Sequence, residues 1–78
     1  MNIEIVTPDT VIFEGEANLV QLPGIDGSFE ILNNHAPLIS VLKAGTIKII
    51  LADKNAKTFD IKGGVVEINH NKLMILAE

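Results

Sequence analysis

The 78-residue sequence contains no cysteine, tryptophan, tyrosine or arginine. Without cysteine there is no disulfide framework, no thiolate zinc site and no cysteine nucleophile. A chain this short buries about 60–65% of the surface that it exposes when unfolded, which supports one compact core but not two. We therefore expect a single domain over residues 1–78, stabilised by packing alone or with the help of partner subunits.

Positive charge and aromatic side chains are also scarce. Six lysines face ten acidic residues, which gives a formal net charge of −4. A negative surface repels the phosphate backbone, so nucleic acid is not an expected partner. The three aromatic residues, Phe13, Phe29 and Phe59, fall inside expected strands and are not interleaved with basic residues as in single-strand binding domains.

Long apolar runs are missing. Unbroken apolar stretches such as residues 49–52 are far shorter than the roughly 20 residues of a membrane-spanning helix. The first seven residues lack the basic region and apolar segment of a signal peptide. We therefore expect no direct insertion into a membrane.

What the sequence does contain favours β-structure. Ile, Val and Thr supply 22 residues, and β-branched side chains pack well on a pleated sheet. Ile47 and Ile49 alternate with polar residues, as do Phe59 and Ile61. This two-residue period is typical of half-buried strands.

Turn residues recur every seven to twelve positions, which indicates an all-β sandwich or barrel. Hairpin tips are predicted at Asp53–Asn55 and Asn69–Asn71, because Asn tolerates left-handed backbone. The pattern predicts nine short strands, at residues 2–7, 10–14, 16–22, 27–32, 38–43, 45–53, 56–62, 64–69 and 72–77.

Several of these strands are apolar on both faces. The segments concerned are residues 3–6, 11–13, 38–42 and 73–76. A small sandwich should expose one polar face of each sheet to solvent. The surplus apolar positions are either ordinary strand ends or part of a docking surface.

The residues offer little for catalysis or metal binding. His35 and His70 are the only histidines, and no short ligand spacing joins them to Glu30 or Glu67. Lys54 lies at a hairpin tip, as the modified lysine of a biotinyl or lipoyl carrier does, but without the neighbours of those motifs. We expect no catalytic residue, metal or cofactor, and a small carrier or ligand-binding β-domain remains the alternative.

One segment carries a specific resemblance. Residues 22–38 read Leu-Pro-Gly-Ile-Asp-Gly-Ser-Phe-Glu-Ile-Leu-Asn-Asn-His-Ala-Pro-Leu. Ile-Val-Thr-Pro and Phe-Glu-Gly precede it, and Gly-Gly-Val-Val-Glu-Ile and Leu-Ala-Glu follow it. In this order and at this spacing, the pieces closely resemble the epsilon subunit of bacterial F-type ATP synthases.

The resemblance implies a two-sheet β-sandwich of about nine to ten short strands. It implies a non-catalytic subunit of the central rotor stalk that binds the gamma subunit and the c-ring. Such a subunit couples rotation of the ring to gamma during proton-driven ATP synthesis. It implies a peripheral position on the cytoplasmic side of the bacterial inner membrane.

The family's loop that faces the c-ring aligns with Gly27–Leu38. The positions carried over from it are Ser28, Glu30, Asn33, Asn34 and His35. Glu30 stands where the family has a small glycine, Asn33-Asn34 replace Pro-Gly, and Ser28 occupies a position that is often acidic. His35 either holds the turn by bonding to neighbouring backbone or meets a carboxylate of the ring.

The family's gamma-facing surface maps to Ile12, Leu38 and Ile39. Typical members continue beyond Leu-Ala-Asp/Glu into two helices that inhibit ATP hydrolysis and in some relatives bind ATP. This sequence ends at Glu78. We therefore expect neither inhibition nor ATP binding from it.

Overall fold

The computed structural model describes all 78 residues and contains six β-strands and no helix. No helix is therefore available that is long and apolar enough to cross a membrane. The strands are β1 (Asn2–Val6), β2 (Val11–Gly24), β3 (Gly27–Leu32), β4 (Leu38–Leu51), β5 (Ala56–Asn69) and β6 (Lys72–Ala77). The all-β class predicted from the sequence is confirmed.

The predicted count of nine to ten short strands is wrong. Three pairs of predicted strands each form one continuous strand of 14 residues, namely β2, β4 and β5. The predicted strands are interrupted at residues 15, 44 and 63, at or beside glycines, but the observed strands continue through these positions. Glycine weakens a strand without ending it, and it often marks a bend.

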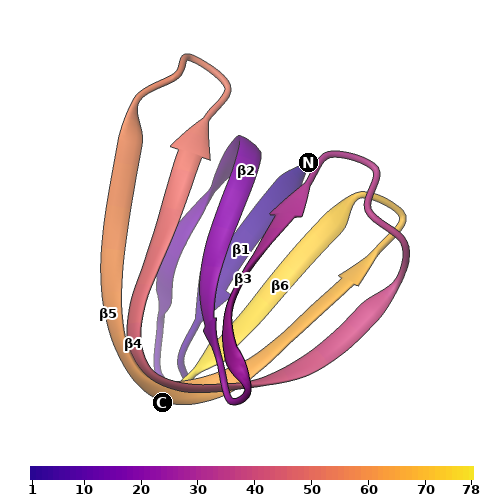
Figure 1. Cartoon of the computed structure of the whole chain (residues 1–78). Helices are drawn as coiled ribbons and strands as arrows, with labels where there is room; N and C mark the ends of the chain where they lie inside the picture. The colour runs from indigo at the N-terminus through magenta and orange to yellow at the C-terminus, as the bar shows by residue number, and fades with distance from the viewer.

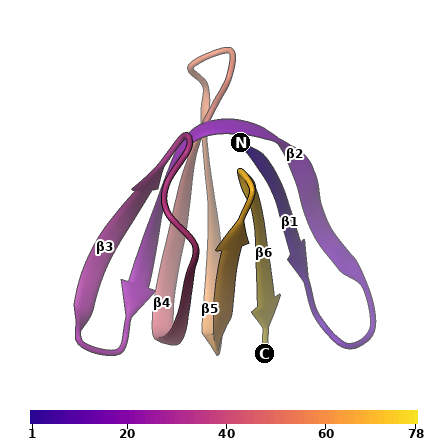
Figure 2. The same cartoon turned by 90° about the vertical axis from the view of Figure 1, so that its right-hand side faces the viewer.

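Backbone pairing closes the strands into a ring. The order is β1-β6-β5-β4-β2, with β2 returning to β1, and β3 pairs only with β2. The β1–β6 pair is parallel, and all other pairs are antiparallel. Figure 1 shows the two walls of the ring meeting at the end where the chain terminates, and Figure 2 shows the strands side by side.

Each long strand is divided between two layers, with one half in each. We call one the β1 layer: it contains β1, β6 and residues 11–16, 38–43 and 64–69 of the long strands. We call the other the β3 layer: it contains β3 and residues 17–24, 45–51 and 56–62. The expected sandwich is therefore present, as one folded sheet with shared strands instead of two separate sheets.

Gly64 shows why one long strand has to carry glycine. A Cβ atom at this position would lie 2.3 Å from the carbonyl oxygen of Leu76, and the φ angle is +156°. Both the close approach of β6 and the backbone angle exclude a larger residue without strain. Glycine here allows β5 to pass close to the end of β6.

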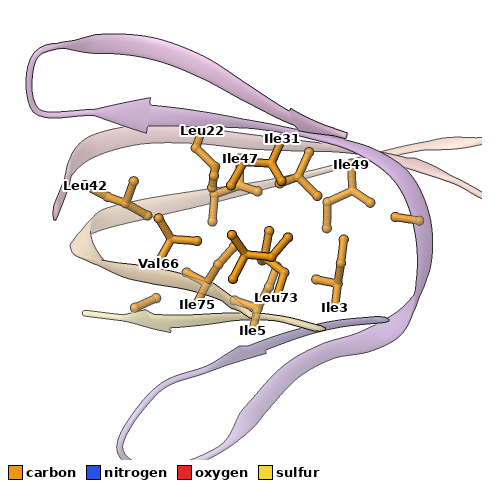
Figure 3. Packing of buried hydrophobic residues seen from close by; sticks show 14 of the residues in the cluster. Ile3, Ile5, Leu22, Ile31, Leu42, Ile47, Ile49, Val66, Leu73 and Ile75 are labelled. Atoms are coloured by element: carbon orange, nitrogen blue, oxygen red, sulfur yellow. The ribbon is translucent and has the colours of Figure 1, made fainter. Parts of the chain in front are cut away.

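The core lies between the two layers. Sixteen apolar residues are buried there, and no polar or charged side chain is buried. Figure 3 shows Ile47 and Ile49 of the β3 layer facing Ile5 and Leu73 of the β1 layer. The alternation seen in the sequence at Ile47 and Ile49 thus reports the core face correctly.

The two hairpin tips predicted from asparagine are present. β4 and β5 join through residues 52–55, where Lys54 has a φ angle of +72°. β5 and β6 join through His70 and Asn71 alone, with φ angles of +51° and +59°. Two central residues with positive φ are the geometry of a tight type I′ hairpin turn.

Candidate interaction surfaces

The outer face of the β1 layer carries a continuous row of apolar side chains. Val41 of β4 is paired with Val65 of β5, and Val65 with Leu76 of β6. Leu76 is in turn paired with Val6 of β1, and Val6 with Val11 of β2. We call these five residues the apolar row. With strands about 4.8 Å apart, it is about 19 Å long.

A second row runs beside it on the same face. In register, it contains Ile39, Glu67, Met74, Glu4 and Glu14. Ile39 is 69% exposed, the highest value among the large apolar side chains. The face is therefore apolar on all five strands, with three carboxylates along one side.

The outer face of the β3 layer is mixed. Its central row contains Glu30, Gln21, Lys48 and Thr58 in register across four strands. Nearby, the Thr46 hydroxyl donates a hydrogen bond of 2.7 Å to Asp60 Oδ1. A second row on the same face is apolar and contains Leu32, Leu19, Ile50 and Ala56. Both layers therefore expose apolar side chains, and the β1 layer differs by its longer apolar row and by the three carboxylates beside it.

The residues expected to face gamma lie along the edges of the β1 layer. Ile39 points outward from β4 beside the apolar row. Ile12 is 40% exposed and occupies the irregularity in the β1–β2 register next to Val11. Leu38 is partly buried against the core, so its side chain offers less outer surface than Ile39.

The residues expected to face the c-ring are all exposed, but they do not form one cluster. Ser28 lies beside the β2–β3 turn, and Glu30 lies midway along β3. Asn33, Asn34 and His35 follow the other end of β3. At about 3.4 Å per residue, Ser28 and Asn33 lie about 17 Å apart along the strand.

The loop between β3 and β4 is held by polar contacts. The Asn34 backbone nitrogen donates a hydrogen bond of 2.8 Å to Asn71 Oδ1, and Asn34 has a φ angle of +62°. Asn33 Oδ1 accepts a hydrogen bond from the terminal ammonium of Met1. His35 Nδ1 lies 2.7 Å from the carbonyl oxygen of Ala36, to which it donates in its Nδ1-protonated form.

The structure brings no catalytic or metal-binding group together. No three His, Asp or Glu side chains gather closely enough to hold a metal ion. His35 and His70 are exposed on separate loops. The surfaces that the structure does present are an apolar face and a polar loop, and both are suited to binding.

The apolar row was missed as a unit by sequence reasoning. The surplus of apolar positions in residues 3–6, 38–42 and 73–76 was the signal for it. Which of those side chains share a face depends on the parallel pairing of β1 with β6 and on the register of β4 with β5. Neither can be read from local periodicity.

Comparison with known proteins gives a family match over the whole chain. The model for the ATP synthase delta/epsilon chain β-sandwich domain matches residues 1–78. The ATP synthase epsilon chain of Chlorobium limicola is 43% identical over 76 residues, which covers 97% of this chain and 86% of that protein. The epsilon chain of Sulfurimonas denitrificans is 44% identical over 78 residues, covering all of this chain and 60% of that protein.

Solved structures agree on the fold. One is a chain of the Euglena gracilis mitochondrial ATP synthase, with a TM-score of 0.85 and 16% identity, covering 96% of this chain and 48% of that one. Another is a chain of the Tetrahymena thermophila mitochondrial ATP synthase central stalk and c-ring, with a TM-score of 0.81 and 23% identity, covering 99% and 62%. The whole-length family match, together with relatives above 40% identity, shows that this chain belongs to the ATP synthase epsilon chains, which are non-catalytic subunits of that complex.

Proposed function

We propose that the chain is a rotor subunit of a bacterial F-type ATP synthase that couples rotation of the c-ring to gamma during proton-driven ATP synthesis. In this role it is peripheral to the inner membrane, on its cytoplasmic side. Membership of the epsilon family supports the proposal. So do the two structural neighbours, which come from complexes described by their c-ring or central stalk.

The observation that carries the proposal is the apolar row on the outer face of the β1 layer, with Ile39 beside it. This face exposes apolar side chains on all five strands of the layer, and Ile39 is 69% exposed. Burying one exposed Val, Leu or Ile stabilises a complex by about 1.5–3 kcal/mol before the costs of association. Covering Ile39 and its neighbours would therefore contribute to a specific interface, and we assign this face, with Ile12 and Leu38 at its edges, to gamma.

The architecture suits a part that transmits torque. A coupling subunit has to hold its two binding surfaces at a fixed separation while both are loaded. Here five strands form a closed ring of backbone hydrogen bonds around an entirely apolar core. Because the ring is closed, the two layers have no free edge between them along which one could move relative to the other.

The polar loop is assigned to the c-ring. Asn33, Asn34 and His35 lie beyond the end of β3 and are exposed. The same assignment includes Ser28 and Glu30 on β3, and Glu30 adds one negative charge to this surface. Asn34 and His35 also hold the loop through hydrogen bonds of their own, so this surface is ordered before any partner binds.

The test is formation of a one-to-one complex with the gamma subunit of the same organism. Purified chain and gamma are mixed and separated by size exclusion with mass detection. Ile39→Asp places a charge on the proposed interface and should abolish the complex. Leu32→Asp is the matched control, because Leu32 is also a large exposed apolar residue but lies on β3 in the other layer.

Binding to the c-ring is tested in the same way, with isolated c-ring in detergent. Adding the ring to the preformed complex should give a larger assembly, and replacement of Asn33 and Asn34 by Asp should weaken it. A chain that stays monomeric with folded gamma, both with and without the ring, would overturn the proposal. The carrier or ligand-binding alternative would then come first.

A further inference from the structure

The apolar row and the acidic side chains beside it meet at one shallow hollow. Val65, Glu67, Met74 and Leu76 line it, on the outer surface of β5 and β6. Three of the lining side chains are apolar, and the fourth brings a carboxylate. None of the three apolar side chains belongs to the buried core.

The carboxylates beside the row have no partner within the chain. The sole ion pair in the structure joins the Met1 ammonium to Glu16, so Glu4, Glu14 and Glu67 have none. Glu4 and Glu14 are directly opposite each other in the β1–β2 pair. Like charges directly opposite each other destabilise a sheet, so Glu4 and Glu14 repel each other in the isolated chain. A basic partner would relieve this repulsion.

No lysine occupies either of the two rows, and Lys72, which lines a neighbouring hollow with Glu67 and Met74, forms no ion pair. The chain as a whole has a net charge of −4 and no arginine. A second copy of this chain would therefore bring further carboxylates to the face and few cations. Charge complementarity instead selects a partner surface that is rich in Lys or Arg.

We propose that the partner of the β1 layer presents an apolar stripe flanked on one side by basic side chains, one of which occupies the hollow. Its aliphatic stem would lie along Val65, Met74 and Leu76, and its cationic head would reach Glu67. Lys and Arg bury their methylene stems in this way while keeping the charge at a polar group. Arg in a partly desolvated pocket is also a frequent energetic centre of interfaces.

Further basic groups on the same side of the stripe would pair with Glu4 and Glu14. The inference rests on the proposed function, because it describes the chemistry of the gamma surface that meets this layer. It adds the requirement for positive charge, which an apolar face alone does not impose. It also predicts that association slows as salt is added.

The experiment measures the affinity of gamma for the whole chain by titration calorimetry at low and high salt. Glu67→Gln keeps the size of the side chain and removes its charge, and we expect about tenfold weaker binding, or about 1.4 kcal/mol. The dependence of affinity on salt should fall as well. Asp60→Asn removes one negative charge from β5 in the β3 layer, outside both assigned surfaces, and should leave both quantities unchanged.

Glu14→Gln should change the stability of the free chain and its affinity for gamma in opposite directions. The melting temperature of the free chain should rise by about 1–5 °C, because repulsion from Glu4 is relieved, while affinity for gamma falls about threefold. A residue with a purely structural role would move stability and affinity in the same direction.

The possible failures can be distinguished. If wild-type chain does not bind gamma at all, the proposed function fails and the inference fails with it. If the wild type binds and Ile39→Asp abolishes binding, while Glu67→Gln and Glu14→Gln change neither affinity nor salt dependence, only the inference is overturned. Dimerisation of the chain alone that is lost on Leu76→Lys would identify a second copy as the occupant and also overturn it.

Discussion

The backbone nitrogen of Asn34 donates a hydrogen bond to Asn71 Oδ1 at 2.8 Å and so ties the β3–β4 loop to the β5–β6 turn. Asn71 also has a φ angle of +59°, a conformation that Asn and Gly tolerate better than other residues. One side chain thus satisfies a tight hairpin turn and orders the loop that we assign to the c-ring. Its two roles can be separated by substitution.

Asn71→Gly should keep the hairpin turn and release the loop. Glycine accepts positive φ but has no side-chain oxygen, so the Asn34 amide loses its acceptor. Amide hydrogen exchange at Asn34 should become faster, while exchange in the cores of β5 and β6 stays as it is. Asn71→Asp retains an oxygen acceptor and should preserve the protection; equal exchange at Asn34 in wild type and Asn71→Gly would contradict the assignment.

Gly64→Ala should destabilise the chain by about 1–3 kcal/mol. The added Cβ would lie 2.3 Å from the Leu76 carbonyl oxygen, a backbone atom of the neighbouring strand that has little room to move. Urea denaturation measures the loss. Gly27→Ala is the control, since Gly27 also has positive φ (+132°) but no atom within 4 Å of the added carbon. A smaller loss at Gly64 than at Gly27 would rule out the steric explanation.

Two isoleucines of β4 should respond differently to truncation. Ile47 is fully buried, so Ile47→Ala should cost about 2–5 kcal/mol through lost burial and the cavity left behind. Ile39 is 69% exposed, so Ile39→Ala should stay within about 0.5 kcal/mol of wild type. Thermal and urea unfolding of both variants test this. A large loss at Ile39 would mean that its side chain packs within the domain and is not free for a partner.

The sequence was sufficient for the fold class but not for the number of strands. Alternation at Ile47 and Ile49 reported the core face, and the asparagines at 69 and 71 located a tight turn. Strand boundaries were predicted at residues 15, 44 and 63, at or beside glycines, where the strands continue. A glycine that bends a strand has the same local signature as one that ends it. Only the partner strand distinguishes the two, and pairing is a long-range property.

The candidate surfaces were predictable to different degrees. The loop residues followed from resemblance, and polar residues beside Gly and Pro are local signals. The apolar row joins Val6, Val11, Val41, Val65 and Leu76 from five strands, and its existence depends on register. Hydrophobicity at these positions indicated a surplus, but no local pattern could show that the surplus lies in one line.

His35 offers the sharpest separation between a structural and an intermolecular role. Its Nδ1 lies 2.7 Å from the Ala36 carbonyl oxygen and donates to it when protonated. The amide nitrogen of Asn can reach the position of Nδ1, whereas the longer Gln side chain places its amide near that of Nε2. If the ring holds the turn, His35→Asn should keep the stability of wild type within about 0.5 kcal/mol. His35→Gln should lose about 0.5–1 kcal/mol, the lower part of the range for one hydrogen bond because the site is exposed.

Binding to isolated c-ring completes the comparison. A role that is only structural predicts that His35→Asn binds the ring as wild type does and that His35→Gln binds it less well, in proportion to the disorder of the loop. If Nε2 instead meets a carboxylate of the ring, the order reverses, because Gln still presents a donor at that position and Asn does not. Equal loss of ring binding in both variants, with stability unchanged, would exclude the turn-holding role and require the imidazole itself at the interface.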